Sequence, residues 1–302
     1  MSSLERKVDF AVVVGVSRAN PNGDPLNGNR PRVNFDGHGE ITDVCLKRKI
    51  RNRLIDAGHP IFVQSADHRV DQYGSLKERV VGELGKDVLE SDESLRKAAC
   101  ERWIDVRAFG QVFAYKGTAK KKKKTKVEDT DSEQEEEADA VSVGVRGPVS
   151  LHSAFSVSPV TSVSTQITKS VNNEGEGTKR GSDTVGMKHR IDHGLYMFYG
   201  SMNPQLAVRT GFSDEDALAI KEALRTLFEN DASTARPEGS MEVHKLIWWN
   251  HNCRNGQYPS AKVHRSLKVA VKLGITEPKC YGDYDIVIEP LLGLATEIVE
   301  GQ

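Results

Sequence analysis

Apolar stretches separated by turn-forming residues recur along the chain. Val8 to Ser17 (VDFAVVVGVS) is the clearest of them, and its nearly continuous β-branched and small apolar residues are typical of a strand buried on both faces. Shorter apolar stretches bounded by Gly and Pro favour strands as well. Further strands are therefore predicted at Val141–Val163, Leu195–Ser201, Val243–Trp249 and Tyr284–Glu289.

A helical pattern follows the first strand, after a loop rich in Asn, Gly, Pro and Arg. In Thr42–Ala57 apolar residues recur every four positions, as they do on the buried side of a helix. Thr42 or Asp43 can cap its start, and Gly58 follows its end. The predicted apolar stripe consists of Leu46, Ile50 and Leu54, and the other sides carry Lys47, Lys49, Arg51 and Arg53.

Two later segments also favour helices. Ser213–Asn230 is amphipathic, and Ser213 with Asp216 has the spacing of a capping box. Glu78–Phe109 has mostly helical character, with breaks expected at Gly82 and Gly85 and a packing face expected from Trp103, Val106 and Phe109. Strand-helix-strand blocks in this order predict an α+β fold. Helices would cover one face of an antiparallel sheet, and a ferredoxin-like core with large insertions fits the order.

Two polar segments lack the apolar residues needed for a core. Thr118–Ala140 contains six lysines followed by eight acidic residues, and we expect a solvated loop there. Thr168–Arg190 is Gly-rich and basic, which favours an extended arm or hairpin projecting from the body. The segment Thr118–Ala140 carries a net charge of −2, against −1 for the whole chain, so the rest of the chain carries +1. Binding to nucleic acid would therefore depend on local clusters of charge.

The composition favours a soluble intracellular protein. The hydrophobic fraction is 37%, the mean hydropathy is −0.49, and no apolar run approaches the roughly 20 residues that cross a bilayer. The first ten residues lack the apolar centre of a signal peptide. We expect a cytoplasmic protein without a disulfide framework. Its four cysteines form no CxxC pair: Cys45, Cys100, Cys253 and Cys280.

Candidate catalytic chemistry is sparse. The sequence contains no GxSxG, GxxxxGK[ST] or HExxH motif. Asp24 and Asp36 could supply carboxylates to a metal, but Asp beside Gly and Pro is more often a turn former. Zinc is disfavoured because the available donors lack close paired spacing. Those donors are His244, His251, Cys253 and His264.

Basic residues cluster beside flexible, Gly-rich segments, which is what binding to a phosphate chain requires. A single charge run usually marks a solvated surface, but three such clusters favour a phosphate-binding role. Aromatic residues make up only 6%, which argues against base stacking as the main contact. The clusters are Arg18, Arg30 and Arg32; Lys47 to Arg53; and Lys169, Lys179, Arg180, Lys188 and Arg190.

Motifs throughout the chain resemble one known family. NPNGDP at Asn20–Pro25, GNRPRV at Gly28–Val33 and TDVCLKRKIRN at Thr42–Asn52 are similar to the backbone subunit of the type I-C CRISPR surveillance complex, Cascade, in the Cas-seven superfamily. The last motif is the most specific. Further similar motifs follow in order: VRGPV at 145–149, SVSPV at 156–160, ITK at 167–169, MKH at 187–189, GLY at 194–196 and TGFS at 210–213.

The resemblance implies an RRM-like, ferredoxin-like palm with inserted finger and thumb elements. On this basis we expect a palm from residues 1–77 and 191–302, and a finger insertion from 78–153 that includes the charged loop 118–140. A thumb arm is expected from 154–190. The charged loop departs from the family, whose connection there is shorter. We assign it no function.

The resemblance also implies a non-enzymatic, RNA-binding role in antiviral defence, without a cofactor or metal. The expected partners are CRISPR RNA, a target DNA strand and further copies of the chain. They also include the 5′-handle-binding, large and small subunits of Cascade. A helicase-nuclease would be recruited indirectly, and no contact with a membrane is expected. The residues expected to contact RNA are Arg18, Asn20, Asn22, Arg30, Arg32, Lys47, Lys49, Arg51, Arg146, Lys169, Lys188 and His189.

Two alternatives stay open at this point. One is an RNA-guided, metal-dependent ribonuclease backbone of the type III kind, in which Asp24 or Asp36 would hold the metal. The other is a structural oligomer that binds no RNA.

Overall fold

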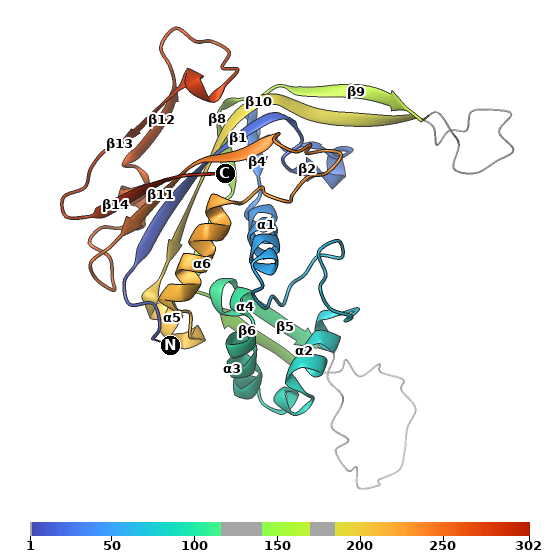
Figure 1. The fold of residues 1–302 in the computed structure, drawn as a ribbon, viewed down its shortest axis with the longest axis vertical. Helices are drawn as coiled ribbons and strands as arrows, with labels where there is room; N and C mark the ends of the chain where they lie inside the picture. The colour runs from blue at the N-terminus through green and yellow to red at the C-terminus, as the bar shows by residue number, and fades with distance from the viewer. Residues whose placement is uncertain (1, 116–140, 170–184) are drawn as a thin grey trace, which may run out of the picture.

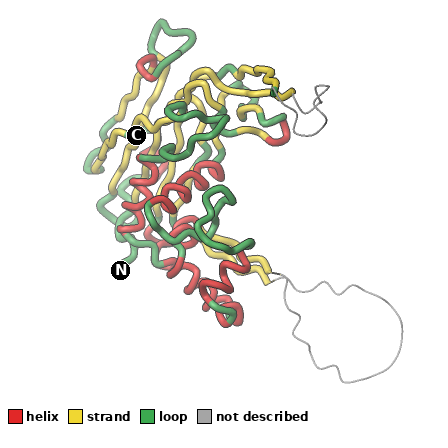
Figure 2. The backbone as a smooth tube through the Cα atoms, turned by 45° about the vertical axis from the view of Figure 1, so that its right-hand side comes forward, coloured by secondary structure: helices red, strands yellow, loops and turns green. Residues whose placement is uncertain are grey.

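The computed structural model describes residues 2–115, 141–169 and 185–302 (Figure 1). The whole predicted charged loop 118–140, together with Lys179 and Arg180, lies outside these residues. A large sheet forms the body, a smaller unit of helices and strands lies at one end, and a two-stranded arm projects from the other end. Figure 2, turned by 45°, shows the same three parts. No helix in the described ranges is long and apolar enough to span a membrane.

The central sheet is antiparallel, with its paired strands in the order β14-β11-β1-β10-β8-β4. The predicted first strand is confirmed as β1, which pairs with β10 on one side and β11 on the other. Two more strands, β7 and β9, pair with β10. The strands are β1 (Val8–Ala19), β4 (His38–Ile41), β7 (Val149–Leu151), β8 (Ala154–Pro159), β9 (Ser162–Thr168), β10 (Val185–Met202), β11 (Met241–Asn250) and β14 (Ala295–Glu300).

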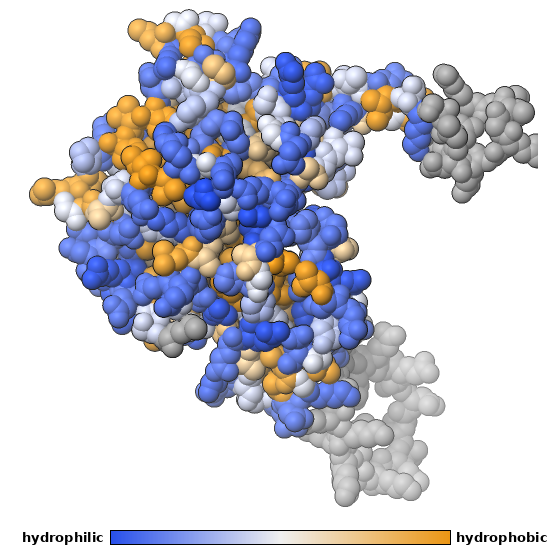
Figure 3. All heavy atoms as spheres, in the orientation of Figure 1, coloured by the Kyte–Doolittle hydropathy of each residue, from blue (hydrophilic) through white to orange (hydrophobic). Residues whose placement is uncertain are grey.

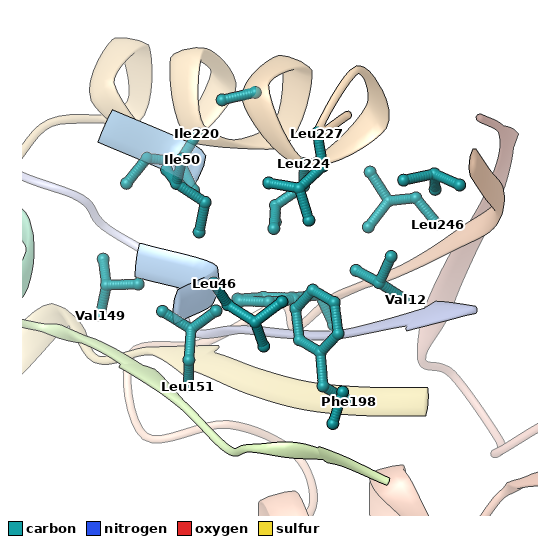
Figure 4. Packing of buried hydrophobic residues seen from close by; sticks show 14 of the residues in the cluster. Val12, Leu46, Ile50, Val149, Leu151, Phe198, Ile220, Leu224, Leu227 and Leu246 are labelled. Atoms are coloured by element: carbon teal, nitrogen blue, oxygen red, sulfur yellow. The ribbon is translucent and has the colours of Figure 1, made fainter. Parts of the chain in front are cut away.

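Two helices cover one face of this sheet, which confirms the predicted helical layer. They are α1 (Asp43–Asp56), capped by the Thr42 side chain, and α6 (Asp214–Arg225), which begins with the expected capping box. The predicted stripe of α1 is buried, and alternate residues of β1 point into the same core. Figure 4 shows side chains of this core, including Leu46, Ile50, Leu224 and Leu246.

The other face of the sheet is covered mainly by strands. The hairpin β12 (Leu267–Val271) and β13 (Tyr284–Ile288), with the short helix α7 (Ser260–His264), packs on Ala11 and Val13. Burial on both faces explains why β1 has an almost unbroken apolar run. Apolar residues are also exposed over β12–β14 (Figure 3). They include Leu273, Val287, Leu292 and Ile298.

A separate small core holds the unit formed by α2 (Leu76–Leu84), α3 (Asp92–Arg102), α4 (Ile104–Phe109) and the hairpin β5 (Gly110–Tyr115) and β6 (Val141–Arg146). The expected break at Gly85 is confirmed, but the break at Gly82 is wrong. Gly82 lies inside α2, where an added Cβ would come within 2.3 Å of the Tyr73 ring. The expected packing face is only partly correct, because Trp103 and Val106 join this core while Phe109 packs against the main one.

The arm is a two-stranded extension of the central sheet. Ser162–Ile191 contains β9 and the first part of β10, which pair from Val185↔Thr168 to Ile191↔Ser162. The predicted hairpin character of Thr168–Arg190 is therefore confirmed at its base. Strand β10 continues without interruption from the arm into the sheet beside β1 (Figure 1).

The remaining short elements connect these parts. They are β2 (Gly23–Asp24), β3 (Arg30–Pro31), α5 (Pro204–Thr210), and the 3-10 turns η1 (Pro25–Asn27), η2 (Asp87–Glu90) and η4 (Tyr281–Asp283).

Candidate nucleic-acid interface

The loop between β1 and β4 has a defined shape that depends on its asparagines. The Asn20 side chain is buried and donates to the Asn29 carbonyl at 2.7 Å. The Asn22 Oδ1 accepts hydrogen bonds from the backbone N–H and the hydroxyl of Thr42, both at 3.0 Å. Because Thr42 caps α1, Asn22 joins the loop to the start of that helix. Both asparagine side chains therefore hold the loop in place.

The arginines of this loop differ in their surroundings. Arg18 and Arg30 are exposed, and neither has an ion-pair partner within the described part of the chain. Arg18 has a φ of 52°, a conformation that non-glycine residues adopt rarely and that is often found at functional sites. Arg32 is partly shielded and lies 3.4 Å from the Asp24 carboxylate. Arg18 and Arg30 are therefore the cations most available to a phosphate.

The predicted turn role of Asp24 is confirmed. Its carboxylate accepts a hydrogen bond from the Leu26 N–H at 3.2 Å and caps the turn η1. Asp36 is exposed in a tight turn in which the Gly37 N–H donates to the Asn34 carbonyl at 3.1 Å. The described residues contain no group of three or more His, Cys, Asp or Glu side chains arranged to hold a metal.

The cations of α1 are engaged with acidic side chains. Lys47 lies 3.0 Å from Asp43 one turn earlier, and the Arg51 Nε lies 2.9 Å from the Asp105 carboxylate. Arg51 also stacks over the Phe109 ring at 5.2 Å. These contacts give both side chains a structural role, while their expected contact with RNA stays a prediction.

Lys49 is buried, with only 4% of its side chain exposed. Its ammonium contacts Asp231 and lies over the Phe228 ring at 5.4 Å. Burial lowers the pKa of Lys49, although the nearby Asp231 carboxylate opposes this effect. Arg236 also binds Asp231, at 3.1 Å. Lys49 therefore has a structural role in this conformation, while its expected contact with RNA stays a prediction.

The side chains of Lys49, Arg48 and Arg236 line a cavity of about 200 Å³ that also includes Asn22. Sequence reasoning missed Arg48 and Arg236 as neighbours of the loop. Arg48 lies in the KRK run, but its exposure depends on which side of α1 is buried. Arg236 lies far along the chain, and no pattern in the sequence connects it to the loop.

On the arm, Lys169 and Lys188 are exposed, whereas His189 is buried. The His189 Nδ1 lies 2.8 Å from the Ser164 hydroxyl on the paired strand. His189 therefore stabilises the hairpin in this conformation. Neither lysine has an ion-pair partner among the residues that are described.

Arg146, which is expected to contact RNA, does not lie on the arm with Lys169 and Lys188. It ends β6 and pairs with Gly110 in the unit of α2–α4, at the end of the molecule away from β9 (Figure 1). The Gly147–Pro148 pair turns the chain before β7, which separates Arg146 from the strands that build the arm.

The histidines near Cys253 form a buried acid-histidine network, and Cys253 itself is exposed. The His251 Nε2 donates to the Asp9 carboxylate at 2.8 Å, while the His251 Nδ1 accepts from the Gln257 N–H. Burial by itself would raise the pKa of Asp9, but hydrogen bonds from His251 and Ser260 and the charge of Lys7 lower it overall. Asp9 is therefore a structural anion.

The sheet register brings two of the basic clusters together. Ala19 pairs with Ile191, so Arg18 lies beside the base of the arm, and β3 packs against β10. The exposed Arg18 and Arg30 of the loop therefore lie at the end of the sheet from which the arm extends. On the arm itself, Lys188 pairs with Thr165, and Lys169 follows Thr168, the last paired residue of β9. Arg146 is not part of this group.

The comparisons with known proteins agree with this architecture. A family model described as "CRISPR-associated protein Cas7" matches residues 6–289. A protein of that name from Haloferax volcanii is 30% identical over 219 residues, which cover 72% of this chain. The match spans 62% of that relative, which is less than two thirds of its length.

One solved structure shows a similar fold at low sequence identity. A chain of a "CRISPR RNA-guided surveillance complex, pre-nicking" aligns with a TM-score of 0.50 and 14% identity, covering 90% of this chain and 84% of that one. A chain of a "CRISPR RNA-guided surveillance complex" aligns with a TM-score of 0.40 and 15% identity, covering 80% and 68%. Because the family model matches nearly the whole chain, this protein belongs to the CRISPR-associated protein Cas7 family.

Proposed function

We propose that this chain is the CRISPR RNA-binding backbone subunit of a type I-C surveillance complex. Copies of it would line up along the guide and present its bases for pairing with a target DNA strand. Family membership supports the role, and the motifs of the loop and of α1 support the subtype. Sequence specificity would then come from base pairing, as in other RNA-guided systems.

One observation carries this proposal. Strand β10 carries the arm away from the end of β1, so that Arg18 and Arg30 on the loop lie at the base of the arm and Lys188 and Lys169 follow along it. Cations without acidic partners can bind phosphates without first breaking an ion pair within the protein. Such contacts are independent of sequence and leave the base edges free.

The proposal includes a ferredoxin-like palm. Supporting it, β1, α1, β8, β10, α6 and β11 occur in this order along the chain with other elements inserted between them, and their strands lie in the order β11-β1-β10-β8. This is the βαββαβ arrangement of that fold. The finger would be the unit of α2–α4 and the thumb would be the arm.

We further propose that assembly uses unlike surfaces of successive copies, because such contacts generate open filaments when the rotation does not close. The other proposed partners are the 5′-handle-binding, large and small subunits, with a helicase-nuclease acting separately. The chain itself would cleave nothing. The turn contacts of Asp24 support this over the ribonuclease alternative.

The test compares two double variants in RNA binding by the assembled protein. Arg18→Ala/Arg30→Ala should weaken binding and reduce the slope of log K against log salt by about 1.4, since each phosphate contact to a single strand contributes about 0.7. The matched control is Arg254→Ala/Arg265→Ala. Both control residues are exposed, and Arg254 lies near Lys7, at the other end of β1.

Equal effects of the two double variants would contradict the proposed interface. An absorbance ratio that shows no nucleic acid in the purified assembly would contradict the RNA-binding role as a whole. Periodic cuts in complementary RNA on addition of magnesium would favour the ribonuclease alternative.

A further inference from the structure

Three Asn-Gly pairs occur in the sequence, and two of them lie in the loop between β1 and β4. They are Asn22–Gly23, Asn27–Gly28 and Asn255–Gly256. Asparagine is among the chemically labile residues. A following glycine promotes its deamidation, because without a side chain the glycine lets the backbone reach the conformation that ring closure needs. The structure gives the three pairs different surroundings.

Asn27–Gly28 lies at the tip of a short hairpin. Strands β2 and β3 pair through Asp24 and Arg30, and the Asn29 N–H donates to the Asp24 carbonyl at 2.8 Å. Both residues of the Asn-Gly pair are exposed. The Asn27 side chain makes no hydrogen bond with another described residue. Its amide is therefore free to turn toward the main chain.

The space around Gly28 is open. A Cβ added there would have no atom within 4 Å apart from its own chain neighbours. A ring that joins the Asn27 side chain to the Gly28 nitrogen can therefore form without displacing another part of the protein.

The pair Asn22–Gly23 is held in place. The Asn22 Oδ1 accepts two hydrogen bonds from Thr42, and a Cβ added at Gly23 would come within 2.0 Å of the Asn29 Oδ1. Ring closure at Asn22 must break both hydrogen bonds. Because one such bond corresponds to about a fivefold change in an equilibrium, Asn22 should react at least about tenfold more slowly than Asn27.

Asn255–Gly256 is exposed at Asn255, but both of its reacting groups are engaged. The Asn255 Oδ1 accepts a hydrogen bond from the Gln205 Nε2 at 2.8 Å, and the Gly256 N–H donates to the Cys253 carbonyl at 3.3 Å. A Cβ added at Gly256 would come within 2.6 Å of the Lys7 Cδ. Exposure alone therefore does not make this pair equivalent to Asn27–Gly28.

We propose that Asn27 is a site of spontaneous deamidation, with water as the co-reactant. The Gly28 backbone nitrogen attacks the Asn27 Cγ and forms a C–N bond. The side-chain nitrogen leaves as ammonia, together with the proton of the Gly28 N–H. Water then opens either C–N bond of the cyclic imide and yields aspartate or isoaspartate. Each product carries a negative charge that asparagine lacks.

The new carboxylate lies three positions before the exposed Arg30. Three residues span at most about 10 Å, which is close to the distance over which salt screens charges. Repulsion of a phosphate bound at Arg30 should therefore weaken RNA binding by about twofold. This consequence rests on the proposed RNA-binding function, whereas the reaction at Asn27 does not.

The test incubates the full-length chain at pH 7.5 and 37 °C and follows its tryptic peptides by tandem mass spectrometry. Digestion in heavy-oxygen water marks any deamidation that occurs during digestion. We expect Asn27 to convert first, with Asn22 and Asn255 as internal controls. Asn27→Gln should abolish conversion at this position, because glutamine would have to close a larger ring. Conversion of Asn22 or Asn255 as fast as Asn27 would overturn the site.

RNA binding by the same samples tests the consequence. Aged wild-type protein and fresh Asn27→Asp should both bind about twofold more weakly than fresh wild type, while aged Asn27→Gln should keep the affinity of its fresh form. Thermal unfolding shows that the fold is retained. Unchanged RNA affinity after conversion of Asn27 would overturn the consequence. Conversion of Asn27 in a protein that binds no RNA even when fresh would support the site and contradict the proposed function.

Discussion

Lys49 on α1 and Asp231 in the segment before β11 form an ion pair below the surface, although 182 positions separate them. The pair joins the helix that follows the loop to the segment that follows α6. Asp231 also binds Arg236, at 3.1 Å, so the carboxylate has two cations while Lys49 has one anion.

This asymmetry predicts unequal effects of removing the two partners. Asp231→Asn leaves a buried ammonium without a counter-charge, and we expect it to lower the free energy of unfolding by about 3 kcal/mol. Lys49→Met should cost clearly less, because Asp231 keeps Arg236 and the methionine fills a similar volume. Urea unfolding of both variants measures the difference. Equal losses would show that the pair is not effectively buried.

Arg51 and Arg48 give a second contrast on the same helix. Arg51 binds Asp105, which is 1% exposed and also accepts the backbone N–H groups of Phe62 and Val63 at 2.7 and 3.0 Å. Arg51→Gln should therefore destabilise the protein by about 2 kcal/mol or more.

Arg48→Gln is the control for Arg51→Gln. Its partner Asp67 is largely exposed, so the change should stay within about 0.5 kcal/mol. Because Arg51 binds the buried Asp105, reversing the charge at Arg51 would lower stability whether or not Arg51 contacts RNA. A larger loss for Arg48→Gln than for Arg51→Gln in urea unfolding would contradict this interpretation.

Ile50 tests the contact between α1 and the sheet. Its side chain is fully buried, so Ile50→Ala should lower the free energy of unfolding by about 2–5 kcal/mol. Val44 on the same helix is 70% exposed, and Val44→Ala should have almost no effect. Chemical unfolding of the two variants gives the comparison. Similar losses would mean that α1 does not pack on the sheet as described.

The histidines predict how stability depends on pH. Burial lowers the pKa of His264 below its ordinary 6.5, although the Asp9 carboxylate opposes this, and burial likewise lowers the pKa of His193 and His244. Just below pH 6.5 the unfolded chain therefore binds more protons than the folded one, so stability falls as pH decreases. Asp9, with its own lowered pKa, would contribute only below about pH 3.8.

Thermal unfolding between pH 7.5 and 5.5 checks this prediction. The midpoint should fall across the range, and His264→Gln should reduce the fall, since the variant lacks one of the titrating groups. A midpoint that rises toward pH 5.5 would contradict the direction of the shifts.

Periodicity predicted the elements whose burial pattern is local. The spacing of Leu46, Ile50 and Leu54 defines the buried side of α1, and the capping residues define both helix starts. Periodicity failed where a contact with another segment decides whether a helix continues. Gly82 favours a break in isolation, yet α2 continues through it because the Tyr73 ring packs where a side chain would lie.

The candidate interface was predictable in composition but not in detail. The sequence singled out the loop and its cations, and the structure shows that Arg18 and Arg30 are exposed. Their contact with phosphate stays a prediction. The sequence could not show that Arg51 and Lys49 are engaged by acids 54 and 182 positions away. Nor could it show that Arg146 pairs with Gly110 in the hairpin of β5 and β6.

Strand β10 passes from the arm into the centre of the sheet as one piece of 18 residues. The arm is thus the projecting end of a strand whose other end lies between β1 and β8 in the central sheet. No unpaired segment separates the arm from the sheet in β10, because the pairing of β10 with β1 begins at Ile191, where its pairing with β9 ends. A displacement of the arm would therefore act first on the pairing of Ile191 with Ala19, the residue next to Arg18.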